Sequence, residues 1–202
     1  MTTGYCDPNG DATVTDSWSG ASPHYTRIDD GVRYPTTTGM TEDNLYLYYY
    51  GDNTGDVALS MTTLTGVQQV TSIKVWIFGG MAGGGHFHID ISKDGTNWVG
   101  EQTVAYFAYH DWQSKTFSGL TWTQTDLDNL QIRLKGHDFN GAEDYEGYID
   151  EMYAEITYTA GMKINIGDVW KDISAIKINI GDVWKDVAGM KINIGDVWKT
   201  VF

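Results

Sequence analysis

The chain has 202 residues and a formal net charge of −14. Its length suits one domain with a buried core plus an appendage, and its negative charge argues against nucleic acid as a partner because a phosphate backbone would be repelled. The 24 glycines, three prolines and many Thr, Val, Ile, Tyr and Trp residues indicate short β-strands joined by glycine turns. No run approaches the roughly 18 apolar residues of a membrane span.

The N-terminal segment 1–7 has no basic cluster followed by an apolar run, so we expect no signal peptide. Without one, the chain would be made in the cytoplasm and reach its destination by assembly or lysis. Cys6 is the single cysteine, which excludes a disulfide within the chain. A free thiol and a disulfide between two chains both remain open for it.

Residues 1–161 predict an all-β domain, an antiparallel β-sandwich of the jelly-roll type. Apolar and polar residues alternate, as where Ile73, Val75 and Ile77 share one strand face. A single capped helical turn is expected within 123–130. The expected strands lie near residues 24–29, 45–50, 56–64, 72–78, 86–92, 98–107, 113–118, 130–135 and 148–158.

The strand 86–92 carries the clearest candidate for a metal site. His86, His88 and Asp90 alternate, so they share the face opposite to the inward apolar residues. Imidazole pairs ligate zinc, with His110 or His137 as a third ligand here. The alternative is that these side chains are simply solvated.

Two loops are rich enough in oxygen to suggest calcium: residues 7–11 and the segment from Asp52 to Asp56. Neither has the spacing of an EF-hand, and both are also ordinary turn sequences. No other cofactor is expected.

The acidic pairs do not suggest a hydrolase. Residues 29–30, 143–146 and 150–151 hold adjacent carboxylates, and neighbours on a strand point to opposite faces rather than across one cleft. The sequence also has no Gly-x-Ser-x-Gly motif. We therefore expect no enzymatic activity.

Aromatic residues give a stronger functional lead. Tyr46, Tyr48 and Tyr50 share one face of a strand, where exposed rings would stack on a sugar or fill a protein interface. The alternative is that most rings pack in the core. Further rings on or beside strands are those of Trp76, Trp98, Trp112 and Trp122.

The last 41 residues are a repeat. The sequence Lys-Ile-Asn-Ile-Gly-Asp-Val-Trp-Lys recurs at a period of 14, in units 162–175, 176–189 and 190–202. Gly-Asp between two β-rich pentads predicts a two-residue hairpin in each unit. With Ile166 facing Val169, the three units would continue as one six-stranded meander. The alternative is a β-prism shared between chains.

This register gives each hairpin an apolar face and a Lys/Asp/Trp face, and about forty residues cannot bury the first alone. We expect the strip to dock on its own head domain or on another subunit, although a duplicated spacer would also explain it. The residues expected at these contacts are Ile164, Ile166, Val169, Trp170, Ile178, Ile180, Val183, Trp184, Ile192, Ile194, Val197 and Trp198.

Two resemblances extend this interpretation. The run Ser92-Lys-Asp-Gly-Thr-Asn-Trp98 resembles the Ser-x-Asp-Gly-x-x-Trp hairpin of discoidin-like and carbohydrate-binding jelly rolls. The layout from Trp18 to Tyr158 resembles a jelly-roll domain of tailed-phage structural proteins, and the C-terminal units are similar to Gly-x-Trp-Lys repeats of phage virion proteins. The second resemblance implies a virion structural, decoration or fibre protein, without catalytic residues.

The sequence therefore supports two hypotheses about function. The first is a phage-type virion or filament subunit that forms homo-oligomers or contacts other subunits through the repeat strip. The second is an adhesin module that binds a surface glycan through the tyrosine strand.

Overall fold

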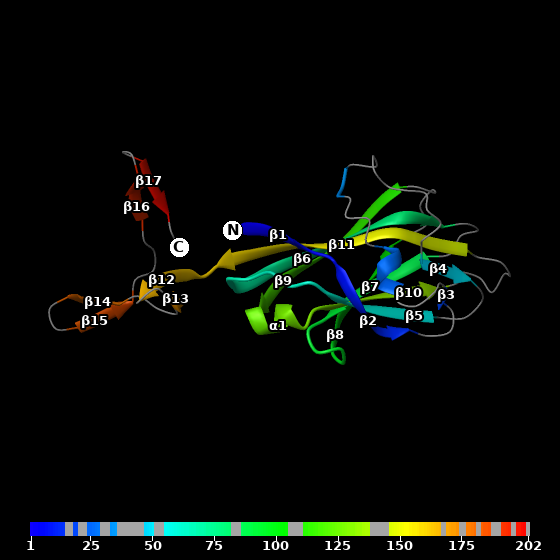
Figure 1. Cartoon of the computed structure of the whole chain (residues 1–202), viewed down its shortest axis with the longest axis horizontal. Helices are drawn as coiled ribbons and strands as arrows, with labels where there is room; N and C mark the ends of the chain where they lie inside the picture. The colour runs from blue at the N-terminus through cyan, green and yellow to red at the C-terminus, as the bar shows by residue number, and fades with distance from the viewer. Residues whose placement is uncertain are drawn as a thin grey trace.

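The computed structural model describes residues 1–14, 18–19, 24–28, 33–35, 47–50, 55–81, 86–104, 111–137, 146–166, 169–173, 177–180, 183–186, 191–194 and 197–200. The described strands confirm the predicted antiparallel β-sandwich (Figure 1). One sheet holds β3 (Trp18–Ser19), β4 (Leu47–Tyr50), β11 (Glu146–Ala160), β6 (Val67–Met81) and β9 (Asp111–Trp122), with β1 (Thr2–Cys6) also on β11. The other holds β2 (Pro8–Val14), β5 (Gly55–Met61), β10 (Gln131–His137), β7 (His86–Ser92) and β8 (Trp98–Val104).

The pairing of the central strands is nested. β7 pairs with β8, β6 with β9, β5 with β10 and β4 with β11, all antiparallel. This is the order of a long hairpin folded over into two sheets, which is the jelly-roll arrangement.

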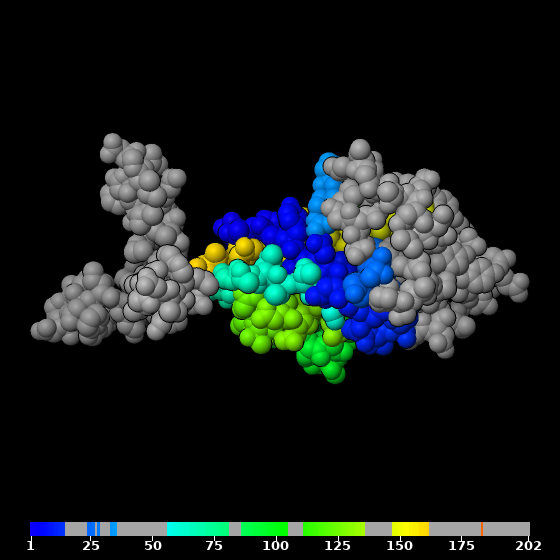
Figure 2. Space-filling model, viewed as in Figure 1, coloured from blue at the N-terminus to red at the C-terminus, as the bar shows by residue number. Residues whose placement is uncertain are grey.

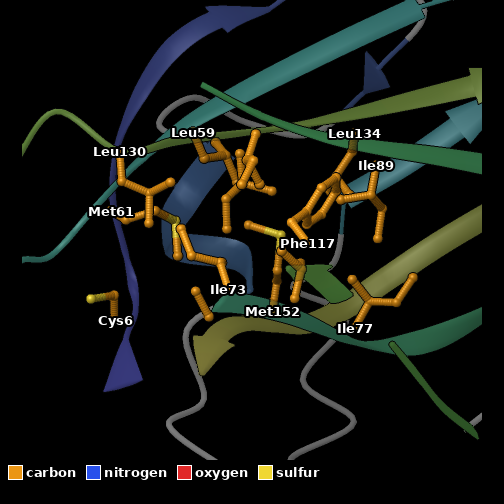
Figure 3. Packing of buried hydrophobic residues seen from close by; sticks show 14 of the residues in the cluster. Cys6, Leu59, Met61, Ile73, Ile77, Ile89, Phe117, Leu130, Leu134 and Met152 are labelled. Carbon is orange, nitrogen blue, oxygen red and sulfur yellow. The ribbon is translucent and has the colours of Figure 1, made fainter. Parts of the chain in front are cut away.

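The core lies between the two sheets. Ile73, Val75 and Ile77 of β6 are fully buried, as are Phe87 and Ile89 of β7, because alternate residues of each strand point inward. Figure 3 shows side chains from both sheets meeting there. The predicted faces of these two strands are therefore confirmed.

Cys6 lies in the same core. Its side chain is fully buried, and burial raises the pKa of its thiol to about 12. Complete burial favours the free thiol over a disulfide between chains, because a second chain could reach the sulfur only after the core had opened.

The strand expected at 24–29 is wrong. His24–Arg27 is a short 3-10 helix, and the carboxylate of Asp11 accepts hydrogen bonds from the backbone N–H groups of His24 (2.9 Å) and Tyr25 (3.0 Å). The side chain therefore caps the turn, and the sequence of 24–29 alone does not indicate this contact. The strands β1, β2 and β3 were not expected either.

The predicted helical turn is confirmed as α1 (Gln124–Asp128). Thr123 accepts from the backbone N–H of Asp126, whose carboxylate accepts from the backbone N–H of Thr123, so the two residues form a capping box. No helix among the described residues is long and apolar enough to cross a membrane.

The repeat units form hairpins with the predicted register. Ile166 lies opposite Val169 and Ile180 opposite Val183. Each described hairpin is a separate two-stranded sheet, so the expected continuous meander is wrong. In Figure 1 the hairpins follow β11 and lie beyond its end. Their strands are β12 (Met162–Ile166), β13 (Val169–Ile173), β14 (Lys177–Ile180), β15 (Val183–Asp186), β16 (Lys191–Ile194) and β17 (Val197–Thr200).

The contact between β6 and β11 can be tested at Gly79. A Cβ atom there would lie 2.1 Å from the backbone oxygen of Tyr148, which cannot move aside as a flexible side chain would. We expect Gly79→Ala to lower the free energy of unfolding in urea by about 1–3 kcal/mol. Gly10→Ala is the control, because its Cβ would meet only the Cβ of Ser60 at 3.9 Å. Equal stability of the two variants would contradict the packing of β6 on β11.

Candidate functional site

The outer face of the six-stranded sheet carries a second cluster of buried rings. Trp76 and Phe78 of β6, Trp112 of β9 and Tyr153 of β11 form it, separately from the main core. These residues alternate with inward-facing ones, so the strands that build the core also place rings on the opposite face.

The segment 33–35 covers this cluster. The ring of Tyr34 stacks on that of Trp76, with centroids 4.4 Å apart and planes 15° apart. The backbone N–H of Tyr34 donates to the hydroxyl of Tyr153 at 3.1 Å. Tyr34 is nevertheless 51% exposed. In Figure 2 the segment (light blue) stands at the surface beside the dark blue N-terminal strand.

Arg33 attaches this segment to the sheet. Its guanidinium forms an ion pair with Asp7, lies 4.0 Å from a carboxylate oxygen of the fully buried Glu151, and is centred 4.4 Å from the ring of Tyr153. A cation over an aromatic face is attracted by the ring quadrupole. One side chain therefore joins Asp7, between β1 and β2, to β11 and to the segment 33–35.

Two further contacts fix Trp76. Its indole Nε1–H donates to a carboxylate oxygen of Glu155 at 2.9 Å, and the ammonium of Lys74 lies 3.7 Å from its ring centroid. Near these rings, burial raises the pKa of Tyr153 to about 12, so its hydroxyl stays protonated at neutral pH.

Tyr5 of β1 adds a second exposed ring. It is 48% exposed and meets Tyr153 edge-on, with centroids 5.9 Å apart. The set Tyr5, Arg33, Tyr34, Trp76 and Tyr153 is called the Tyr34 platform below. It offers two half-exposed rings held in place by buried ones, together with fixed charged groups, which suits a ligand with both flat apolar faces and hydroxyl groups.

The predicted tyrosine strand lies on the same sheet. Tyr48 and Tyr50 belong to β4, at register positions opposite Tyr148 and Glu146 of β11. Tyr46 lies outside the described residues. A role for these three in glycan binding stays a prediction.

Two side chains of the metal candidate on β7 have charged partners in the structure. Asp90 forms a bidentate ion pair with Arg133, and Nδ1 of His88 lies 3.3 Å from a carboxylate oxygen of Glu101. In the described part of the chain, no group of three His, Cys, Asp or Glu side chains is placed to hold a metal ion. Asp90 is therefore ion-paired with Arg133, and a metal role for His86, His88 and Asp90 stays a prediction.

The calcium candidates also have other partners where they are described. Asp7 pairs with Arg33, and Asp11 binds His24. Asp56 lies 3.5 Å from Arg133, and Asp52 lies outside the described residues. Residues 29–30, 110 and 143–145, considered above for hydrolysis or metal binding, also lie outside them.

Comparisons with known proteins give structural likenesses only. No family model and no curated protein matches the sequence. TmCBM61, solved in complex with β-1,4-galactotriose, is similar at 14% identity and a TM-score of 0.36, over 54% of this chain and 68% of that one. The adhesin domain of Lys-gingipain from Porphyromonas gingivalis shows 12% identity and a TM-score of 0.33, over 54% and 73%.

A third neighbour is a Stig cyclase from Fischerella, with 15% identity and a TM-score of 0.30, over 72% of this chain and 89% of that one. TM-scores this low assign no function to the chain. None of the three is named as a virion protein, so the resemblance to phage structural proteins stays a prediction.

The part of the site that sequence reasoning missed is the segment 33–35. Arg33 and Tyr34 contact Tyr153, about 120 residues later in the chain, and no local sequence pattern indicates such a contact. A weak signal was present in Lys74 and Trp76, which alternate with Ile73, Val75 and Ile77 and therefore fall on the face of β6 turned away from the core.

The contribution of Arg33 to the stability of the fold can be measured. Removing one partner of a buried ion pair leaves the other charge with poorer compensation. We therefore expect Arg33→Ala to lower the free energy of unfolding by about 3 kcal/mol. This is the low end of the range for such pairs, because the Arg33 side chain is 28% exposed. Arg33→Lys keeps the charge but loses the planar group over Tyr153, and should cost less. Thermal and urea unfolding of both variants test this. Loss of the same size in both would show that the charge of Arg33 does not contribute and would contradict the ion-pair account, whereas wild-type stability of Arg33→Lys would show that charge alone explains the role of Arg33.

Proposed function

We propose that the chain is a non-enzymatic glycan-binding module, and that the Tyr34 platform on the outer face of the six-stranded sheet is its binding surface. The observation that carries the proposal is the ring of Tyr34, half exposed and stacked on the buried ring of Trp76. A flat ring already fixed in place can receive the C–H face of a sugar with little loss of side-chain entropy.

The surrounding charges favour a neutral sugar. The guanidinium of Arg33 is neutralised by Asp7 and Glu151, and Glu155 beside Trp76 is a hydrogen-bond acceptor. The formal net charge of −14 would also repel an acidic glycan. Hydroxyl groups of a neutral hexose can instead share the hydrogen-bonding capacity of these fixed groups.

The decisive pair of variants is Tyr34→Ala and Tyr34→Phe. Removing the ring should weaken binding of neutral oligosaccharides by roughly tenfold, the effect of losing one stacking contact, whereas Tyr34→Phe keeps the ring and should retain most of the affinity. A glycan array followed by isothermal titration with the best neutral glycan gives both values. Wild-type affinity in Tyr34→Ala, or no neutral glycan bound by the wild type, would contradict the proposal.

A second candidate function, assembly through the repeat hairpins, rests on Val183. It lies opposite Ile180, at an apolar position of the second hairpin, and is 56% exposed. A two-stranded hairpin is only marginally stable alone in water, so an uncovered apolar position favours burial against another chain. The partner that we propose is a second copy, because identical units at a fixed period can pair with one another in register.

Assembly can be tested without truncating the protein. We expect the full-length chain to exceed its monomer mass of 22.5 kDa in light scattering, and to return to that mass when charge is placed on the apolar face. The charged variant replaces Val169, Val183 and Val197 by Lys. The matched control replaces Asn165, Asn179 and Asn193, at the alternate positions, by Ser. A monomeric wild type at all concentrations would exclude this function.

A further inference from the structure

The outer face of the five-stranded sheet carries a second organised group, built around Trp98. Trp98 opens β8 and lies opposite Ser92, at the end of the run Ser92-Lys-Asp-Gly-Thr-Asn-Trp. Its ring lies over the guanidinium of Arg133, whose central carbon is 4.1 Å from the ring centroid. This contact is separate from the Tyr34 platform, which lies on the other sheet.

The turn before Trp98 is held by an unusual number of hydrogen bonds. The carboxylate of Asp94 accepts from the backbone N–H groups of Thr96 (2.8 Å) and Asn97 (2.7 Å) and from the side-chain amide of Asn97 (2.8 Å). The hydroxyl of Ser92 donates to the carbonyl of Asn97 at 2.9 Å. The hydrogen bonds that Asp94 accepts from Asn97 and Thr96 hold the pKa of its carboxyl well below the usual value.

Gly95 completes the turn with φ of +70°, a conformation that other residues rarely adopt. The hydrogen bonds and Gly95 together fix the conformation of this turn. That conformation sets where the chain enters β8, so the Trp98 ring is in position before a ligand binds.

Arg133 is equally constrained. Its Nε donates to Asp90 at 2.9 Å, a second nitrogen donates to the other oxygen of the same carboxylate, and a third lies 3.5 Å from Asp56. Asp90 is almost fully buried, with 2% exposure. Acceptance of these hydrogen bonds by Asp90 raises the pKa of Arg133.

A second ion pair lies on the same face of the sheet, beside that of Asp90 and Arg133. The ammonium of Lys135 donates to Glu101 at 2.6 Å, and Glu101 also lies 3.3 Å from His88. The hydrogen bond from Lys135 is the main reason that the pKa of Glu101 is lowered. The six residues His88, Asp90, Trp98, Glu101, Arg133 and Lys135 are called the Trp98 strip.

Stability alone does not account for this choice of residues. Exposed ion pairs contribute about 0–1 kcal/mol each, and a buried pair such as Asp90 with Arg133 is often no better than apolar residues of the same volume. Thr and Val at these positions would satisfy the sheet equally well. What the charged residues add is a rigid array of donors and acceptors, with a ring beside it and with the opposite charges matched.

We propose that the Trp98 strip is a second, independent binding site for a neutral saccharide, so that one chain holds two glycans on its two outer faces. The ring of Trp98 would receive a C–H face of the sugar. The ammonium of Lys135 and the carboxylate of Glu101, which already form a hydrogen bond with each other, would also bind adjacent hydroxyl groups. Matched charges at the strip favour a neutral ligand over a uronic acid or a sulfated sugar.

The test uses the full-length protein labelled with ¹⁵N and titrated with neutral gluco-, galacto- and manno-oligosaccharides, with an oligogalacturonate as the acidic probe. The indole N–H resonance of Trp98 should shift with a neutral probe and not with the acidic one. Trp98→Ala should weaken binding at the strip by roughly tenfold. Thr96→Ala, in the same turn but with only its backbone N–H used there, should bind as the wild type does.

Arg133→Lys tests whether a loss of binding has a cause other than misfolding of the variant. It keeps a cation beside Asp90 but removes the bidentate geometry and the flat surface under Trp98, so it should weaken binding in a chain whose ¹⁵N spectrum still shows the folded sandwich. An unmoved Trp98 resonance with every neutral probe, a response to the oligogalacturonate alone, or wild-type affinity in Trp98→Ala would overturn the proposal.

Repeating the titration in Tyr34→Ala separates the two sites. If both exist, the wild type binds two oligosaccharides per chain and each single variant binds one tightly. If only the Trp98 strip binds, Tyr34→Ala behaves as the wild type and the function proposed for the Tyr34 platform fails while this inference stands. If only Tyr34→Ala weakens binding, the reverse holds.

Discussion

The constraint on which this structure depends is the two-residue period of the β-strand in a sandwich of two sheets. Each long strand must send alternate side chains into the core, as β6 sends Ile73, Val75 and Ile77, and must then place the residues between them on the outer face. Folding therefore fixes the outer face as firmly as the inner one. Trp76 and Arg133 occupy such outer positions, so both candidate sites take their rigidity from the core behind them.

The two faces use this rigidity differently. On the six-stranded sheet, the segment 33–35 packs on the cluster of buried rings, and the ion pair of Arg33 with Asp7 attaches it there. On the five-stranded sheet, the ring comes from the start of a strand, and its position is set by a hydrogen-bonded turn at Asp94. One site depends on a long-range contact and the other on a local one.

That difference explains how far the sequence alone could reach. The alternation on β6 and β7, the capped turn at Thr123 and the hairpin register at Ile166 and Val169 follow from local periodicity or turn chemistry, and each was predicted correctly. The contact of Tyr34 with Trp76 joins distant segments, so the sequence indicated the outward position of Trp76 but not its partner. The 3-10 helix at His24 depends on a carboxylate thirteen residues earlier, and the described strands of the repeat pair only within each hairpin, whereas the expected meander needs pairing between hairpins as well.

Both proposals make the sandwich a rigid carrier whose outer faces, and not a cleft, meet the ligand. The measurement that tests this claim most directly is a structure of the full-length chain with a neutral oligosaccharide bound. We predict a sugar ring stacked on Tyr34, with a second on Trp98 at higher ligand concentration. A sugar bound away from both rings, or a structure that shows the two outer faces covered by neighbouring copies and closed to sugar, would contradict it.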